Sequence, residues 1–92
     1  MKKDKEKKLG LKYAELSNDL KNLIADIAGV AVSAIKDSTD LQKHLGIDSF
    51  NAVEILVAIE QRYGIKIEQA EVFGIRTFQD VFDLAKKYLL KK

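Results

Sequence analysis

Cysteine, proline and tryptophan are all absent from this chain of 92 residues. Without cysteine the chain itself has no disulfide, no thiolate nucleophile and no thiolate ligand for zinc or an iron–sulfur cluster. Its length fits one domain, whose stability must come from side-chain packing. No uncharged stretch approaches the ~20 apolar residues of a membrane span, and no apolar run follows the lysines of residues 1–8. We therefore expect a soluble, cytoplasmic protein without stable membrane insertion.

Basic residues are concentrated at the two ends, although the formal net charge is only +2. Five lysines against two acids give +3 in residues 1–8, and four lysines give +4 in residues 86–92, which leaves −5 for residues 9–85. A basic arm can contact nucleic acid or anionic lipid, but terminal lysines more commonly serve solvation. An acidic body favours basic protein partners, and we expect no nucleic acid among the partners.

Apolar residues recur at helical spacing over most of the chain, and glycines interrupt the pattern. It predicts a first, a second, a short third and a last helix, over residues 16–28, 48–63, 68–73 and from 77 onward. The second helix begins at Asp48 or Ser49, because both are good N-caps. Thr77, with Asp80 at capping-box spacing, begins the last. These elements predict an all-α fold, a small four-helix bundle, preceded by a basic N-terminal extension over residues 1–15.

The second helix has more apolar surface than one core face requires. At ~100° per residue, one stripe consists of Ala52, Leu56, Ile59 and Tyr63. An adjoining stripe, which we call the docking strip, consists of Phe50, Val53 and Val57, and its polar border consists of Glu54, Glu60 and Gln61. The strip can be a wider buried face, an interpretation that stays open for Val53. An exposed apolar strip framed by carboxylates is typical of a docking surface for a partner with an apolar patch and a basic rim.

Ser49 lies at the start of this helix, where free backbone N–H groups and the helix dipole favour an anion by ~0.3–1 kcal/mol. A phosphate ester on Ser49 would be well placed there. Ser49 can equally be an ordinary N-cap that contributes ~1 kcal/mol. Helix physics alone favours the cap.

The second helix opens with a motif that reads Leu45-Gly46-Ile47-Asp48-Ser49-Phe50, and Val53-Glu54-Ile55 and Glu60 follow at helical spacing. In this motif the chain resembles the acyl carrier proteins. The helix order, the long loop after Gly29 and the Thr-x-x-Asp start of the last helix match that family as well, so the resemblance covers residues 16–88. It implies an acyl carrier domain over residues 16–90.

The resemblance implies a noncatalytic carrier without a metal. In that family the motif serine is esterified by 4′-phosphopantetheine, which a phosphopantetheinyl transferase takes from coenzyme A. Acyl groups then ride as thioesters on the terminal thiol of this arm. Ser49 is the corresponding residue, with Asp48 beside it. A chain without cysteine would thus receive its reactive sulfur with the prosthetic group.

Family membership further implies that Asp48, Glu54 and Glu60 meet basic patches of acyl-transferring, ligase or synthase enzymes in fatty acid or related lipid or secondary-metabolite biosynthesis. The docking strip would supply apolar contact to the same enzymes. We expect the carrier to be a monomer. Such carriers can also draw the acyl chain between their helices, where eight buried methylenes would gain ~6 kcal/mol before the core is opened. The expected lining of that cavity is Leu56, Ile59, Ile67 and Phe78.

Several positions depart from the family pattern. Phe50 replaces the usual leucine after the serine, and Lys43-His44 replaces an acidic pair. Acids that are usual in the second helix are replaced by Asn51, Gln61 and Arg62. The docking face is therefore less negative than is typical, and we predict a specialised carrier that serves one pathway.

Other functions fit the residues less well. A peptidyl or D-alanyl carrier would use the same serine and arm, and it is the nearest alternative. A small helical DNA-binding protein is a more remote one, because Glu54 and Glu60 would face the phosphates. A hydrolase built on Ser49 lacks the Gly-x-Ser-x-Gly motif. A metal site at Asp37, Asp40 and His44 lacks a recognised ligand spacing.

Overall fold

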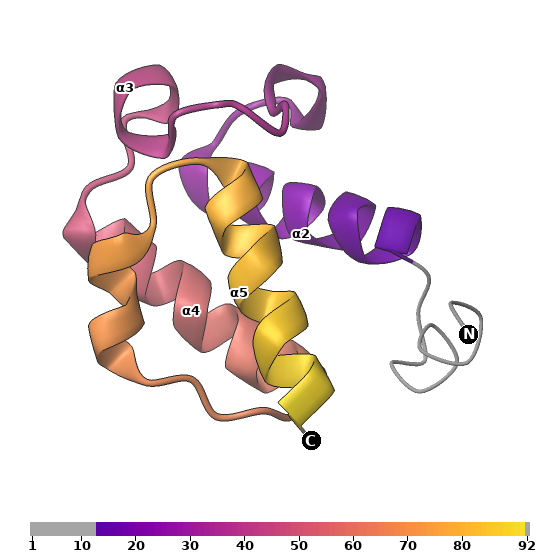
Figure 1. The fold of residues 1–92 in the computed structure, drawn as a ribbon. Coiled ribbons are helices and arrows are strands. Elements are labelled where there is room, and N and C mark those ends of the chain that lie inside the picture. The colour runs from indigo at the N-terminus through magenta and orange to yellow at the C-terminus, as the bar shows by residue number, and fades with distance from the viewer. Residues whose placement is uncertain (1–12, 92) are drawn as a thin grey trace.

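In the computed structural model, which describes residues 13–91, all regular elements of the described part are helical (Figure 1). In chain order these are α2 (Tyr13–Ala28), the 3₁₀ helix η1 (Val32–Ala34), α3 (Leu41–Leu45), α4 (Ser49–Tyr63), the 3₁₀ helix η2 (Gln69–Gly74) and α5 (Phe78–Lys91). The three longer helices and the short η2 confirm the predicted all-α bundle. Of the expected N-terminal extension, residues 1–12 lie outside the described residues, and residues 13–15 form the first turn of α2.

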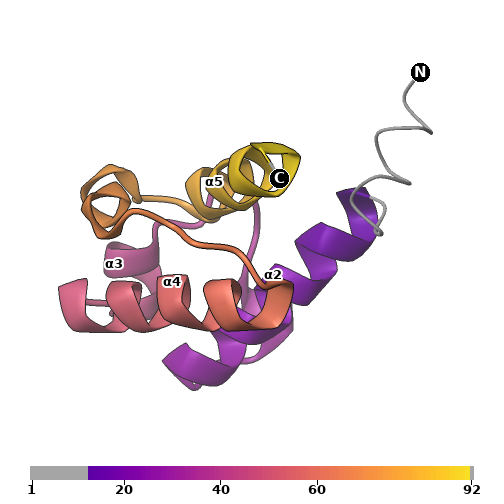
Figure 2. The same cartoon turned by 90° about the horizontal axis from the view of Figure 1, so that it is seen from below.

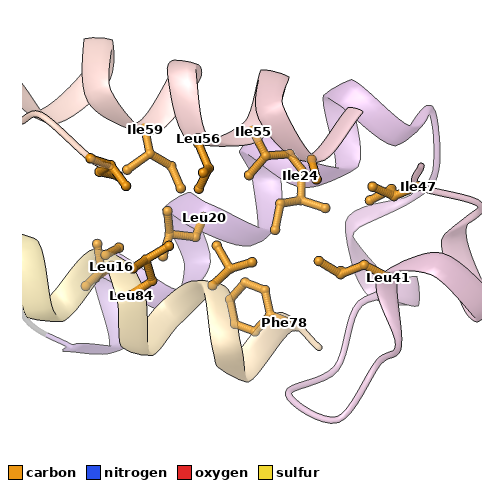
Figure 3. Packing of buried hydrophobic residues seen from close by; sticks show 14 of the residues in the cluster. Leu16, Leu20, Ile24, Leu41, Ile47, Ile55, Leu56, Ile59, Phe78 and Leu84 are labelled. Atoms are coloured by element: carbon orange, nitrogen blue, oxygen red, sulfur yellow. The ribbon is translucent and has the colours of Figure 1, made fainter. Parts of the chain in front are cut away.

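The core lies between α2, α4 and α5, because α2 contacts both of the other two helices. Figure 3 shows the labelled side chains of these helices pointing toward a common centre. The largest fully buried side chains are Leu16, Leu20, Ile24, Ile55, Ile59, Phe78 and Val81. The predicted core stripe of α4 is thus confirmed at its centre, and Tyr63 is partly buried at its end. Ile55, which lies outside that stripe, is only 1% exposed, so the buried face of α4 is wider than predicted.

Glycines end α2, α3 and α4, and for α2 and α4 they do so at the predicted places. Gly29, Gly46 and Gly64 have φ values of 72°, 69° and 64°, the left-handed conformation that a residue with a Cβ adopts only at a cost. Gly46 ends α3, and its N–H donates to the carbonyl of Gln42. This turn sends the chain through Ile47 and Asp48 directly into α4.

The long loop after α2 is fastened to the start of α5. The N–H of Leu41 donates to the carbonyl of Arg76 at 2.9 Å, and the N–H of Phe78 donates to the carbonyl of Thr39 at 3.0 Å. The hydroxyl of Thr39 is buried and accepts the N–H of Lys36 at 2.7 Å. These bonds hold α3 beside the start of α5, which sets one wall of the region around Ser49.

η2 lies beside the first half of α4, as the two perpendicular views agree (Figures 1 and 2). The carboxylate of Glu71 in η2 accepts hydrogen bonds from Lys87 and from the hydroxyl of Tyr88, at 3.2 and 2.7 Å. Because both donors belong to α5, η2 is held between α4 and α5. It forms the second wall of the region around Ser49.

Candidate functional site

Asp48 is the N-cap of α4. Its Oδ1 accepts the N–H of Asn51 at 2.8 Å, and Asn51 Oδ1 accepts the N–H of Asp48 at 3.5 Å. The two bonds form a capping box, with asparagine in the position that glutamate or glutamine commonly takes. The structure thereby decides between the two predicted caps, and Ser49 is the first residue of the helix proper.

Ser49 is exposed and lines an open groove of about 800 Å³. Ser49 and Ala52 line it from α4. Across from them η2 contributes Val72 and Phe73, and the connector to α5 contributes Ile75. The groove therefore offers room and apolar surface next to the serine hydroxyl.

Charged side chains also line this groove. They are Asp40, Asp48, Asp80 and one cation, Arg76. Arg76 Nε lies 3.6 Å from an Asp40 oxygen. The N–H of Lys43, followed by the charge of Arg76, holds the pKa of Asp40 below its usual value, so this carboxylate is ionised at neutral pH. The surroundings of Ser49 carry a net negative charge.

The docking strip lies largely at the surface. Phe50 is 70% exposed and Val57 is 39% exposed, whereas Val53 is partly buried. Among the bordering polar residues, Glu54 and Gln61 are exposed. Glu54 Oε1 accepts a hydrogen bond from the side chain of Asn51 at 3.0 Å, which joins this acid to the capping box.

Glu60 differs from Glu54, the other acid that borders the docking strip. It is partly buried, and its Oε2 accepts the N–H of Ile67 at 2.7 Å. This bond ties the connector after α4 back onto the helix. Glu60 thus has a structural task that the sequence pattern did not indicate, and its docking role stays a prediction.

The end of α4 is tied to α2. Asp19 accepts hydrogen bonds from the guanidinium of Arg62 and from the hydroxyl of Tyr63. The hydrogen bond from Arg62 is the main reason that the pKa of Asp19 lies below its ordinary value. Burial, followed by the hydrogen bond to Asp19, raises the pKa of Tyr63. Arg62 therefore belongs to an ion pair between α2 and α4. The sequence comparison had counted it only as a replacement for an acid that is usual in this helix.

The four residues predicted to line an acyl cavity, Leu56, Ile59, Ile67 and Phe78, are all buried in the core. Leu56 and Ile67 also line a depression of about 310 Å³ beside Val53 and Val57. None of the four lines the groove at Ser49. An acyl chain among them would require the packed core to open, so this lining stays a prediction.

His44 and the acids near it do not form a metal site. The Nδ1 atom of His44 in α3 accepts the N–H of Asp40, the N-cap of that helix, at 2.8 Å. Within residues 13–91, no group of three or more histidine, aspartate or glutamate residues could hold a metal ion. None of the helices within residues 13–91 combines the length and the apolar character that a membrane span needs.

The family model for the phosphopantetheine attachment site matches residues 18–84, which include Asp48, Ser49, the docking strip and the groove. The chain belongs to this family of phosphopantetheine-binding acyl carrier proteins. It is a noncatalytic carrier, and its prosthetic group is 4′-phosphopantetheine, as the resemblance to this family implied. The exposed hydroxyl of Ser49 beside an open groove fits the attachment of such an arm.

Three curated proteins illustrate the similarity. The chain is 34% identical over 65 residues to polyketide-8 synthase acyl carrier protein 2 of Streptomyces avermitilis, covering 71% of this chain and 75% of that one. It is 31% identical to an acyl carrier protein of Saccharopolyspora erythraea, covering 76% and 74%. It is 29% identical to an acyl carrier protein of Acidothermus cellulolyticus, covering 82% and 89%.

A solved structure confirms the fold. The solution structure of the apo doublet acyl carrier protein from prodigiosin biosynthesis superposes with a TM-score of 0.72 and is 24% identical. The match covers 83% of this chain but only 37% of that longer one. The helical arrangement of this carrier is therefore that of a known acyl carrier protein.

Proposed function

We propose that Ser49 is the attachment site and that residues 16–90 are the carrier domain, which transports acyl groups as thioesters on the arm. The observation that carries this assignment is the position of Ser49. It is the exposed first residue of α4, it lines the groove, and it lies within the matched residues 18–84. The arm, when bound, supplies the thiol that the chain lacks.

The residues around Ser49 support a phosphodiester there. Asp48 provides the helix cap, so the serine hydroxyl is not needed for that bond. The first N–H groups of α4 and its dipole favour an anionic substituent by ~0.3–1 kcal/mol. The chain thus orients the attached group without chemistry of its own.

The docking strip, with Asp48, is proposed to meet the phosphopantetheinyl transferase and the acyl-transferring, ligase or synthase enzymes. Phe50 and Val57 offer apolar contact, and Glu54 offers a charge at the same exposed face. Exposed ion pairs contribute little individually, so these contacts should be brief and sensitive to salt. Such contacts suit a monomeric carrier that visits several enzymes in turn.

We further propose a specialised pathway of polyketide or other secondary-metabolite synthesis. The 34% identity to a polyketide synthase carrier supports this assignment, as do the departures at Phe50 and Asn51. A comparison of acyl loading by enzymes of general fatty acid synthesis and by a polyketide synthase acyltransferase tests it. Equal rates with both sets would contradict a specialised carrier.

The attachment site is tested by intact mass after incubation with coenzyme A and a broad-specificity phosphopantetheinyl transferase. We expect the wild type to gain one phosphopantetheinyl group and Ser49→Ala to gain none. Ser38→Ala is the matched control, because Ser38 is also exposed but lies in the loop before α3. A wild type that stays unmodified, or a Ser49→Ala chain that is modified, would refute the assignment.

A further inference from the structure

Two large aromatic side chains are exposed at the Ser49 end of the molecule. Phe50 directly follows the serine, and Phe73 of η2 is 88% exposed. Phe73 also lines the groove that Ser49 lines. Burying such a side chain stabilises a protein, and this chain forgoes that gain on folding. Two of them beside one functional residue indicate a surface that is covered by a partner.

Phe73 is exposed although its segment is held firmly. η2 packs against α4, and Glu71, two residues earlier, bonds to Lys87 and Tyr88 of α5. The neighbouring Val72 is partly buried against the core. The backbone of η2 is therefore placed by its neighbours, and Phe73 is presented to solvent from a fixed position.

We propose that Phe73 is a docking residue for the phosphopantetheinyl transferase that modifies Ser49, and that it enters an apolar pocket of that enzyme. This inference rests on the proposed function of Ser49. The transferase must bring its active site to the Ser49 hydroxyl itself, and so it must cover the groove that Ser49 and Phe73 both line. An enzyme that acts on the distant thiol of the arm has no such constraint.

The charges of the groove favour this partner over two others. Asp40, Asp48 and Asp80 outnumber Arg76, which is itself paired with Asp40. Coenzyme A carries several phosphate charges, so the enzyme surface that holds it beside Ser49 must be cationic and complements these acids. A second copy of this chain would bring like charges together, and an anionic membrane would be repelled.

The area of the patch also argues against a second copy. A phenylalanine buries ~150–250 Å², whereas a stable protein interface buries ~1,200–2,000 Å² in total. Phe50 and Phe73 alone fall well short of that area even when both copies contribute. They suit a small anchor within a transient enzyme complex.

The test measures steady-state loading of Ser49 by a broad-specificity phosphopantetheinyl transferase while the carrier concentration is varied. We expect Phe73→Ser to raise KM for the carrier about tenfold, with kcat within about twofold of wild type. Phe73→Leu should keep most of the apolar contact and raise KM less than threefold. Val32→Ser is the matched control, since Val32 is an exposed apolar residue of η1 that does not line the groove.

The outcomes separate the inference from the proposed function. An unchanged KM for Phe73→Ser, with normal loading of Ser49, overturns the docking role and leaves the attachment site intact. A wild type that is not loaded at Ser49 overturns both. Sedimentation velocity measures whether the wild type is a dimer and whether Phe73→Ser is a monomer. That result would assign Phe73 to a contact with a second copy and would refute its docking to the transferase. Thermal unfolding shows whether each Phe73 variant is folded. Phe73→Gln provides a second polar variant should Phe73→Ser be unfolded.

Discussion

The two ends of α4 are held in different ways. At its end, Arg62 and Tyr63 bond to Asp19 of α2, and Glu60 bonds to the connector at Ile67. At its start, the side-chain hydrogen bonds seen within residues 13–91 join Asp48, Asn51 and Glu54 to one another. The ends are ~22 Å apart for 15 residues. The helix is thus anchored at one end and accessible at the other, so stability and access depend on different residues.

The largest effect is expected in the core between these ends. Ile59→Ala removes a fully buried side chain and should lower the free energy of unfolding by ~2–5 kcal/mol. Phe50→Ala, on the exposed side of the same helix, should change it by less than ~0.5 kcal/mol. Urea unfolding measures both. Similar losses for the two variants would contradict the assignment of the two faces.

A smaller effect is expected at the anchored end. Asp19→Ala removes the partner of Arg62 and Tyr63 and should cost ~1 kcal/mol, a value reduced because these groups also reach water. Loading of Ser49 should be unchanged, because the site lies at the other end of α4. Asp26→Ala, at an exposed acid on the same helix, is the control. A loss of loading in Asp19→Ala would show that the two ends are coupled.

The anchored end should also be sensitive to acid. The folded pKa of Asp19 lies below its ordinary value of 3.8, so the unfolded chain binds this proton more readily. The stabilisation is therefore complete at pH values well above 3.8 and is lost as the pH falls through the folded pKa. The difference in unfolding free energy between wild type and Asp19→Asn should shrink below about pH 4. A difference that stays constant down to pH 2 would argue against the pair with Arg62.

At the accessible end, Asp48→Ala removes the cap and should cost ~1 kcal/mol. Asp48→Asn should cost much less, since asparagine caps a helix about as well as aspartate. Chemical denaturation of the two variants compares them directly. If both lose the same stability, the charge of Asp48 matters more than its hydrogen bond to Asn51.

The smallest effect is expected when single charges at the border of the docking strip are changed. Glu54→Lys should raise the KM of the transferase about threefold at low salt and less at high salt, because exposed charge pairs are screened. Glu60→Gln keeps an oxygen for the N–H of Ile67 and should leave KM nearer to wild type. A KM for Glu54→Lys that does not depend on salt would exclude an electrostatic contact.

Local patterns predicted the helices well, and contacts between distant residues could not be predicted. Apolar spacing and the glycines placed α4 between Asp48 and Gly64, as observed. The bond from Arg62 to Asp19 spans 43 positions, and no periodicity signals which distant residue an arginine meets. The exposure of Phe73 likewise depends on how η2 lies against α4 and α5.

The candidate site divides in the same manner. The motif alone indicated Ser49, but two neighbouring residues were equally good caps until the backbone showed Asp48 outside the helix. Ile55 was not assigned to the core, because a helical wheel does not show how many neighbours surround a helix. Helical spacing and the family resemblance placed Glu60 at the border of the docking strip, whereas its hydrogen bond to Ile67 depends on the path of the connector.

The cap at Asp48 has a consequence for a protein that is charged and discharged many times. Asp48 caps the first turn of α4, whereas the neighbouring Ser49 presents the hydroxyl. A substituent on Ser49 therefore does not break the hydrogen bond that caps the helix. Apo and substituted forms can then share one backbone at this corner. Every enzyme that binds there would meet the same backbone conformation, whichever acyl group the carrier holds.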